Sequence, residues 1–273
     1  MTKARLDVLL VERGLVESRA KAQALIMAGQ VRVDGQVALK AASPIDPAAA
    51  LTIDSPPRFV SRGGEKLEAA LEAFEISVRG LVCADVGAST GGFSDCLLQR
   101  GAAKVYAIDV AKGMLHWKLR KDPRIIAVEQ TNARFVDLLP EAVSLATIDA
   151  SFISLKILLP VVKKWFSARP GSPPPFKENR EGWRGVIALI KPQFEAGRQD
   201  AARGGGVIRD AAIHRQVLLD VLTFAQAEGL GGRGLIRSPL LGPKGNTEFL
   251  AWLGFDDGKD IQQLIDRCFE NSS

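Results

Sequence analysis

The chain has 273 residues, 47% of them hydrophobic and 25% charged, a composition that can bury a core and excludes a disordered chain. Its net charge of +5 mildly favours a polyanionic partner such as nucleic acid. Three widely spaced cysteines and two distant histidines provide neither a disulfide framework nor a set of metal ligands. We therefore expect a globular protein without a bound metal.

The most apolar long window, VSLATIDASFISLKILLPVV, is a poor candidate for a membrane span. It is interrupted by Asp149, Lys156 and Pro160, whereas a span needs about 20 largely apolar residues. The first residues, MTKARLDVLLVERGL, contain no apolar segment of the length found in signal peptides. These features predict a cytoplasmic protein with no membrane span.

The first 55 or so residues predict a small α+β unit. RLDVLLVER has the pattern of a short amphipathic helix, and Ser18 and Gly29 are suited to begin and end a second helix over RAKAQALIMA. In VRVDGQVA, the pair Asp34-Gly35 predicts a tight turn between two short strands. LTI at 51–53 could add a third strand.

Strand and helix patterns alternate through the rest of the chain, as is typical of a doubly wound parallel sheet. The segments GLIRSP and EFLAWLGF, joined by LLGPKGNT, predict a closing antiparallel hairpin. We expect strands at 81–86, 104–109, 125–129, 145–149 and 186–191, and helices at 66–74, 92–99 and 154–166.

A glycine-rich turn, ADVGASTGGFSD, follows the first of these strands and precedes a helix. Its spacing is neither that of a dinucleotide fingerprint nor that of a P-loop. Asp109 ends the next strand, where a carboxylate accepts hydrogen bonds from ribose hydroxyls. A glycine turn, a ribose partner and Asn132 as an amide contact to adenine together favour S-adenosylmethionine. NAD, or a turn without a ligand, are the alternatives at this point.

Four charged residues occupy positions where an α/β sheet places its chemistry. Asp149 and Lys191 end strands, Glu248 begins the last strand, and Lys66 opens a helix. Such groups could orient and deprotonate a ribose 2′-hydroxyl for attack on a sulfonium methyl group. A lysine beside a second lysine can be neutral and act as the base, although the sequence leaves the proton acceptor open. For each residue alone, an ordinary surface ion pair is the alternative.

Several segments, in order, resemble a known family. RLDVLLVERGLVESRAKAQALIMAGQVRVDG resembles the S4 RNA-binding domain, and SRGGEKL, DVGASTGGF, KPQFE and GPKGNTEF resemble the bacterial TlyA family. Members of this family are named both hemolysin A and ribosomal RNA methyltransferase, and the catalytic domain is similar to the FtsJ (RrmJ) 2′-O-methyltransferases. The resemblance implies an S4-like RNA-binding domain at 1–58, a linker at 59–65 and an FtsJ-like methyltransferase domain at 66–273. The implied fold of this domain is the Rossmann-like class I methyltransferase fold, a mostly parallel seven-stranded sheet with a closing antiparallel strand.

The resemblance also implies a reaction, a cofactor and site residues. The reaction is S-adenosylmethionine-dependent 2′-O-methylation of cytidine in 23S rRNA, and in some members also in 16S rRNA, with ribosomal subunits as partners. The family's catalytic set of two lysines, an aspartate and a glutamate falls on Lys66, Asp149, Lys191 and Glu248. Its cofactor motif falls on Gly87, Ser89, Thr90, Gly91, Phe93 and Asp109, to which we add Asn132 and Asp149.

Two basic stretches are candidates for RNA contacts. Residues 1–60 contain eight Lys/Arg and six Asp/Glu, a balance that on charge alone indicates a solvated face, whereas the S4 resemblance favours RNA. The second stretch surrounds a triple glycine after Lys191 and could equally be an ordinary loop. Phe194 is interpreted as a core residue, with stacking on a flipped base as the alternative. The RNA-binding candidates are Arg5, Arg13, Arg19, Lys21, Arg32, Arg198 and Arg203.

Three other classes of protein fit the sequence less well. A membrane-lytic protein would need a signal, a span or an exposed amphipathic helix. A NAD oxidoreductase would need a different glycine pattern. A non-catalytic ribosome-binding protein would be expected to have lost one of the four charged residues. The sequence thus predicts a methyltransferase, and a hemolysin-type or non-catalytic RNA-binding protein is the alternative.

Overall fold

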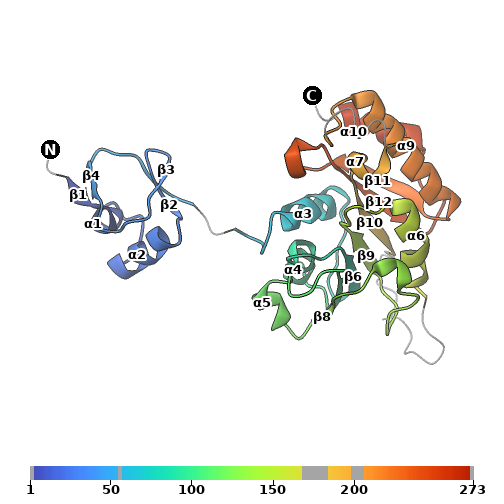
Figure 1. The fold of residues 1–273 in the computed structure, drawn as a ribbon, viewed down its shortest axis with the longest axis horizontal. Helices are drawn as coiled ribbons and strands as arrows, with labels where there is room; N and C mark the ends of the chain where they lie inside the picture. The colour runs from blue at the N-terminus through green and yellow to red at the C-terminus, as the bar shows by residue number, and fades with distance from the viewer. Residues whose placement is uncertain (1–2, 55–56, 168–183, 198–205, 271–273) are drawn as a thin grey trace. The chain divides into compact units, whose positions relative to one another are not determined.

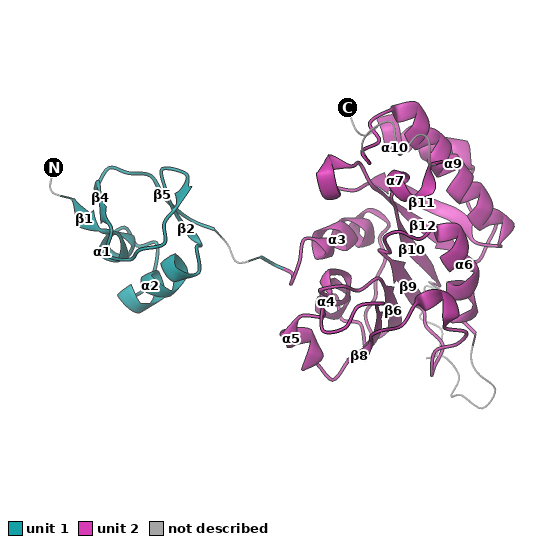
Figure 2. Cartoon of the chain, viewed as in Figure 1, with its two compact units in different colours: residues 1–58 teal, residues 59–273 magenta. Residues whose placement is uncertain are grey.

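A computed structural model of the chain describes residues 3–54, 57–167, 184–197 and 206–270. The chain forms two compact units, residues 1–58 and 59–273 (Figure 1, Figure 2). The segment 59–65, which the sequence analysis treats as a linker, is part of the second unit. Phe59 is buried, and helix α3 (Gly63–Ala73) begins before the predicted residue 66. Phe59 packs in a hydrophobic core of the second unit. The sequence around Phe59 does not show which distant residues will bury its ring.

The first unit consists of two helices and short strands around one small core. Ser18 begins α2 by accepting a hydrogen bond from the amide of Lys21, and Gly29 follows the helix with a positive φ, both as predicted. Asp34 and Gly35 also have positive φ, the geometry of the tight hairpin turn. The elements are β1 (Ala4–Arg5), α1 (Leu6–Glu12), α2 (Arg19–Met27), β2 (Val31–Val33), β3 (Gln36–Val37), β4 (Pro44–Ile45) and β5 (Leu51–Ile53).

The second unit is built on a seven-stranded sheet with the order β11-β12-β10-β9-β6-β7-β8. Strand β12 runs antiparallel to both β10 and β11, and the pairs among the remaining neighbours are parallel. This confirms the mostly parallel sheet and the closing hairpin. The strands are β6 (Val82–Val86), β7 (Lys104–Ile108), β8 (Ile125–Val128), β9 (Leu145–Ile148), β10 (Gly185–Ile190), β11 (Gly231–Arg237) and β12 (Phe249–Gly254).

Helices cover both faces of this sheet, which is therefore doubly wound (Figure 1). Alternate strand residues enter different cores: Ala84 packs with residues of α6, α9 and α10, whereas Cys83 packs with residues of α3 and α4. Helices α9 and α10 were not predicted from the sequence. The helices are α3, α4 (Gly92–Gln99), α5 (Trp117–Arg120), α6 (Leu155–Lys164), α7 (Pro192–Glu195), α9 (Ala211–Ala227) and α10 (Ile261–Glu270), with 3-10 turns η1 (Ala133–Phe135) and η2 (Pro243–Gly245). Among the helices described, none is long and apolar enough to cross a bilayer.

Candidate active site

Three of the four predicted charged residues meet because of the strand register. Asp149 and Lys191 directly follow β9 and β10, which are parallel neighbours and therefore end at the same edge of the sheet. Strand β12 begins at that edge, and Ile190 faces Phe249 across the antiparallel pair, so Glu248 lies opposite Lys191. Glu248 precedes the strand rather than beginning it. Lys66 comes from α3, where it is the fourth residue rather than the first.

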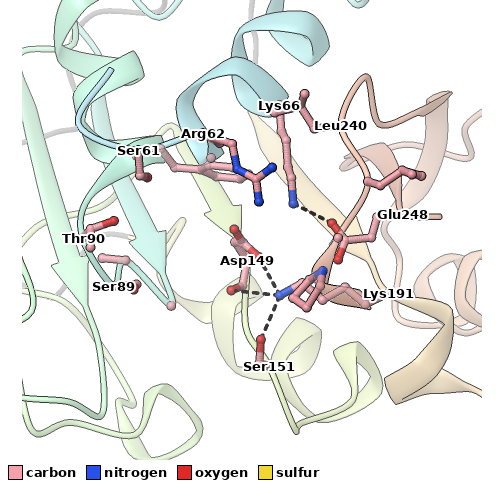
Figure 3. A pocket seen from close by; sticks show the side chains of 18 residues that line it. Ser61, Arg62, Lys66, Ser89, Thr90, Asp149, Ser151, Lys191, Leu240 and Glu248 are labelled. Carbon is pink, nitrogen blue, oxygen red and sulfur yellow. Dashed lines mark hydrogen bonds and ion pairs between the residues drawn. The ribbon is translucent and has the colours of Figure 1, made fainter. Parts of the chain in front are cut away.

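The four side chains form two ion pairs in one cavity. The Lys66 ammonium lies 2.6 Å from Glu248 Oε2, and the Lys191 ammonium lies 2.7 Å from Asp149 Oδ1. Figure 3 shows the two pairs side by side, each lysine directed toward its carboxylate. Each ammonium contacts a carboxylate, and both lysines line the same cavity, so the hypothesis that a lysine beside a second lysine acts as the base stays a prediction. An ordinary surface ion pair does not describe Glu248 and Lys191, whose side chains are 0% and 9% exposed, whereas their partners Lys66 and Asp149 are 12% and 24% exposed.

Two further residues contact these pairs. Ser151 Oγ accepts a hydrogen bond from Lys191 Nζ at 3.0 Å, and the Asp149 carbonyl oxygen accepts another at 3.5 Å, so this ammonium makes three contacts (Figure 3). Glu248 Oε1 is buried and has no hydrogen-bond partner among the described residues. A Cβ atom at Gly242 would lie 2.0 Å from that oxygen, so only glycine leaves room for the carboxylate here. One acceptor of the site thus has no hydrogen-bond donor in the part of the chain that the structure describes.

The ion pairs open onto a cavity of about 330 Å³ that also contains part of the glycine turn. A second cavity, of about 650 Å³, adjoins it, and the two share Gly87, Ser89, Asp149 and Ser151 as lining residues. Of the remaining cofactor candidates, Thr90 and Phe93 line the first cavity and Asp109 and Asn132 line the second. Gly91 lines neither. A Cβ atom there would collide with Leu119, so its role is to let α4 approach that side chain.

Asp109 and Asn132 are held by the backbone at the rim of the second cavity. The Asp109 carboxylate accepts hydrogen bonds from the amides of Ser89 and Ala111, at 2.8 and 2.7 Å, which fixes the glycine turn to the end of β7. Each carboxylate oxygen retains a second lone pair for a ligand hydroxyl. Asn132 Oδ1 accepts from the amide of Arg134, and its NH₂ group has no partner among the described residues. Both side chains are therefore oriented and still able to bind.

Several lining residues were not identified from the sequence, among them Ser151, Arg62 and Phe152. Arg62 lines the first cavity and has no ion pair among the described residues. Phe152 lines the second cavity, is 90% exposed and has a φ of 64°. Its ring lies 4.9 Å from that of Phe194, which is half-buried and so is not the predicted core residue. In sequence, Phe152 lies in an apolar run and has no signal that separates it from the core.

The basic candidates of the first unit do not form one row of free charges. Arg5 and Arg19 both contact Asp7, Arg32 is paired with Asp54, and Arg13 donates to the carbonyl oxygen of Ala49. Lys21 is exposed. Arg198 and Arg203 lie outside the described residues. No three His, Cys, Asp or Glu side chains gather as a metal-binding group in the described parts of the chain.

Comparisons with known proteins show that this fold is that of a methyltransferase. Residues 59–255 match the profile of the FtsJ-like methyltransferase family, and residues 4–50 match the S4 domain. The 16S/23S rRNA (cytidine-2'-O)-methyltransferase TlyA of Mycobacterium tuberculosis is 45% identical over 92% of this chain and 90% of its own length. Hemolysin A of Brachyspira hyodysenteriae is 40% identical over 90% of this chain and 98% of its own length.

A solved structure described as a hemolysin from Streptococcus thermophilus is also similar in fold. Its TM-score is 0.68 at 40% identity, covering 99% of this chain and 97% of that one. The chain therefore belongs to the TlyA family of FtsJ-like methyltransferases, with an S4 domain ahead of the methyltransferase domain. The resemblance seen in the sequence motifs is confirmed.

Proposed function

We propose that this protein transfers a methyl group from S-adenosylmethionine to the ribose 2′-oxygen of a cytidine in ribosomal RNA. The observation that supports this most directly is the convergence of two lysine–carboxylate pairs, each with one buried member, in one cavity beside the glycine turn. The names of the relatives favour the same reaction, since TlyA of Mycobacterium tuberculosis is a 16S/23S rRNA (cytidine-2'-O)-methyltransferase. The S4 domain supplies a reason for RNA as the acceptor.

The two cavities suit S-adenosylmethionine in size and in chemistry. When bound, it supplies an electrophilic methyl group on a sulfonium. Asp109 is positioned to accept hydrogen bonds from ribose hydroxyls, and Asn132 offers its NH₂ group to an adenine. Gly87 has a φ of 81°, and a Cβ atom there would lie 2.6 Å from the Asp149 carbonyl oxygen, so the turn approaches closely only because it is glycine. These features favour a nucleoside cofactor.

The lysine–carboxylate pairs would orient the acceptor hydroxyl. Lys191 donates to Asp149 Oδ1, to Ser151 Oγ and, at 3.5 Å, to the Asp149 carbonyl oxygen, and the 2′-oxygen would replace the last and longest of these contacts. Glu248, which is paired with Lys66, has one carboxylate oxygen without a partner among the described residues. A hydrogen-bond donor of the substrate could bind this oxygen after a small rotation of the Glu248 side chain. Fixed dipoles in a largely buried site cost no reorganisation during reaction, which is the main source of such catalysis.

The test is transfer of labelled methyl groups from S-adenosylmethionine to purified ribosomal subunits. We expect label at a cytidine ribose 2′-oxygen with the wild type and at least a hundredfold less with Lys191→Ala. Lys164→Ala is the matched control, because Lys164 is an exposed lysine at the end of α6 with a loose 4.0 Å contact to Asp137. Cofactor binding is measured in parallel by calorimetry.

Each outcome of this test has a defined meaning. Label on one subunit or on both would define the substrate range. Label on a base nitrogen or carbon instead of ribose would contradict the proposed reaction. No label on either subunit, with the cofactor still bound, would contradict RNA as the acceptor. Equal transfer by Lys191→Ala would remove Lys191 from the catalytic set.

A further inference from the structure

A buried carboxylate organises two arginines at the surface of the first unit. Asp7, in the first turn of α1, is 0% exposed. Its Oδ1 and Oδ2 accept two parallel hydrogen bonds from Arg5, each 3.0 Å long. Oδ2 also accepts from Arg19 Nη2 at 3.1 Å and from Gln23 Nε2 at 2.9 Å. One carboxylate therefore fixes side chains from β1 and α2.

The two arginines keep most of their hydrogen-bonding capacity for another partner. Their side chains are 50% and 56% exposed, although the carboxylate that holds them is buried. A guanidinium has five N–H donors, of which Arg5 uses two and Arg19 uses one. Two positive charges share one negative charge, so the cluster has a net charge of +1. A cluster with free N–H groups and excess positive charge suits phosphate oxygens.

Ordering the arginines in advance reduces the cost of binding. A free arginine side chain loses rotamer entropy when a contact immobilises it. In this cluster the contact with Asp7 has already fixed both side chains. The hydrogen bonds from Arg5 hold the pKa of the Asp7 carboxyl well below its usual range, so the anchor stays charged near neutral pH.

We propose that Asp7 is a positioning residue for RNA, which aligns Arg5 and Arg19 as a fixed pair of phosphate-binding groups. The partner is the phosphodiester backbone of the RNA that the enzyme methylates, and in this respect the inference rests on the proposed function. Phosphate contacts of this kind set the register of a protein on its nucleic acid without reading sequence. The S4 unit would then place the RNA through shape and charge.

A second ion pair in the same unit provides a matched control. Arg32 and Asp54 are paired at 2.9 Å, and both side chains are 40% exposed, so neither partner is a buried anchor. Asp7→Asn and Asp54→Asn each remove one negative charge. By net charge alone, both substitutions strengthen binding to a polyanion. A loss of affinity that is confined to Asp7→Asn therefore cannot come from net charge.

The experiment measures the affinity of the full-length chain for ribosomal subunits at several salt concentrations. We expect Asp7→Asn to weaken binding at least fivefold and to reduce the slope of log affinity against log salt by about one or two. Asp54→Asn should bind as tightly as the wild type or more tightly. In an Arg5→Ala/Arg19→Ala background, Asp7→Asn should cause no further loss, because Asp7 acts through these arginines. Unchanged or tighter binding by Asp7→Asn, or an equal loss in that background, would overturn the inference.

Two additional measurements separate positioning from folding and from catalysis. If hydrogen exchange shows that Asp7→Asn unfolds α1 and α2, the deciding variant is Arg5→Lys/Arg19→Lys, which keeps the charge and loses the planar donor pair. It should also bind at least fivefold more weakly, and wild-type affinity would overturn the inference. Methyl transfer at saturating RNA should be unchanged in Asp7→Asn, with only KM raised. If the wild type binds subunits but transfers no methyl group, the proposed function fails while the binding test of Asp7 still stands.

Discussion

At the residue scale, Asp85 is the most unusual group near the glycine turn. It lies in β6, two residues before Gly87, and is 0% exposed. Ser94 Oγ donates to one of its carboxylate oxygens at 2.7 Å and Thr147 Oγ1 donates to the other at 3.1 Å. Burial raises the pKa of Asp85 to about 7, despite these two hydrogen bonds. The Asp85 carboxyl thus links Ser94 of α4 to Thr147 of β9. Because the group is buried, its ionised form lowers the stability of the folded chain.

The raised pKa of Asp85 predicts a pH dependence of stability. Between its ordinary pKa of 3.8 and about 7, the unfolded chain releases this proton and the folded chain retains it, so the free energy of unfolding falls as pH rises. Asp85→Asn should remove this loss and raise the unfolding midpoint at pH 8 by about 5 °C or more. Thermal unfolding followed by tryptophan fluorescence over a pH series measures the effect.

Asp256 is the control for this measurement, because Arg233 lowers the pKa of its carboxyl. The stability that it contributes is present above its ordinary pKa and is lost as pH falls, which is the opposite direction. Asp256→Asn should therefore leave the decline between about pH 5 and pH 8 unchanged. The same slope in wild type and Asp85→Asn would contradict the assignment to Asp85.

At the scale of elements, the glycine turn is coupled to the end of β9. The turn is anchored by Asp109 through the amide of Ser89 and packs against the backbone of Asp149 at Gly87. A change in the turn therefore moves Asp149, and with it the partner of Lys191. Backbone contacts of Asp149 with Gly87 and with Val86, whose carbonyl oxygen accepts from the Asp149 amide at 2.8 Å, thus connect the glycine turn with the Lys191–Asp149 pair.

Alanine substitutions at two glycines can separate the free-energy cost of backbone strain from that of a steric clash. Gly80 and Gly87 have φ values of 75° and 81°, but a Cβ atom at Gly80 has nothing within 4 Å. Gly80→Ala should cost about 1–2 kcal/mol of stability through strain alone. Gly87→Ala should cost more and should also weaken S-adenosylmethionine binding at least tenfold, because Asp149 must shift. Calorimetric titration and thermal unfolding measure both, and equal effects of the two substitutions would contradict the proposed coupling.

At the scale of the whole molecule, positive charge is spread over the two units. Residues 1–60 contribute +2 (eight basic against six acidic residues), which leaves +3 of the total +5 for residues 61–273. Each unit also has a hydrophobic core of its own, with Leu6, Leu10 and Ile26 in the first. Both parts are thus compatible with a long polyanionic substrate, and neither needs the other to bury its apolar side chains.

The boundary between the units can be tested with two fragments. Phe59 lies directly on Gly64, and the amide of Val60 donates to Asp95 of α4 at 2.9 Å. A fragment of residues 58–273 should therefore retain the stability of the second unit, whereas one of residues 63–273 should lose roughly 3 kcal/mol or more. The shorter fragment should also bind S-adenosylmethionine more weakly, since Lys66 and the turn lie next to these contacts. Equal denaturation midpoints would show that 59–62 is a linker after all.

Sequence alone determined most strands, several helices and the residue types of the site. The strands at 82–86 and 145–148, the caps Ser18 and Gly29, and the turn at Asp34-Gly35 follow from periodicity and from preferences that act over a few residues. Asp149 and Lys191 could be located because a charge after a buried strand must lie at the sheet edge. Such signals act over a few residues, so they can be read from the sequence without knowledge of the tertiary structure.

Tertiary structure decided which of these groups meet. Lys66 and Glu248 are 182 residues apart and are paired only because α3 lies against the edge where β12 begins. The anchoring of Lys191 by Ser151, the exposure of Phe152 and the burial of Phe59 likewise depend on packing between distant segments. The physical reason is that side-chain contacts are set by strand register and helix packing, and neither of these is encoded in any short stretch of sequence.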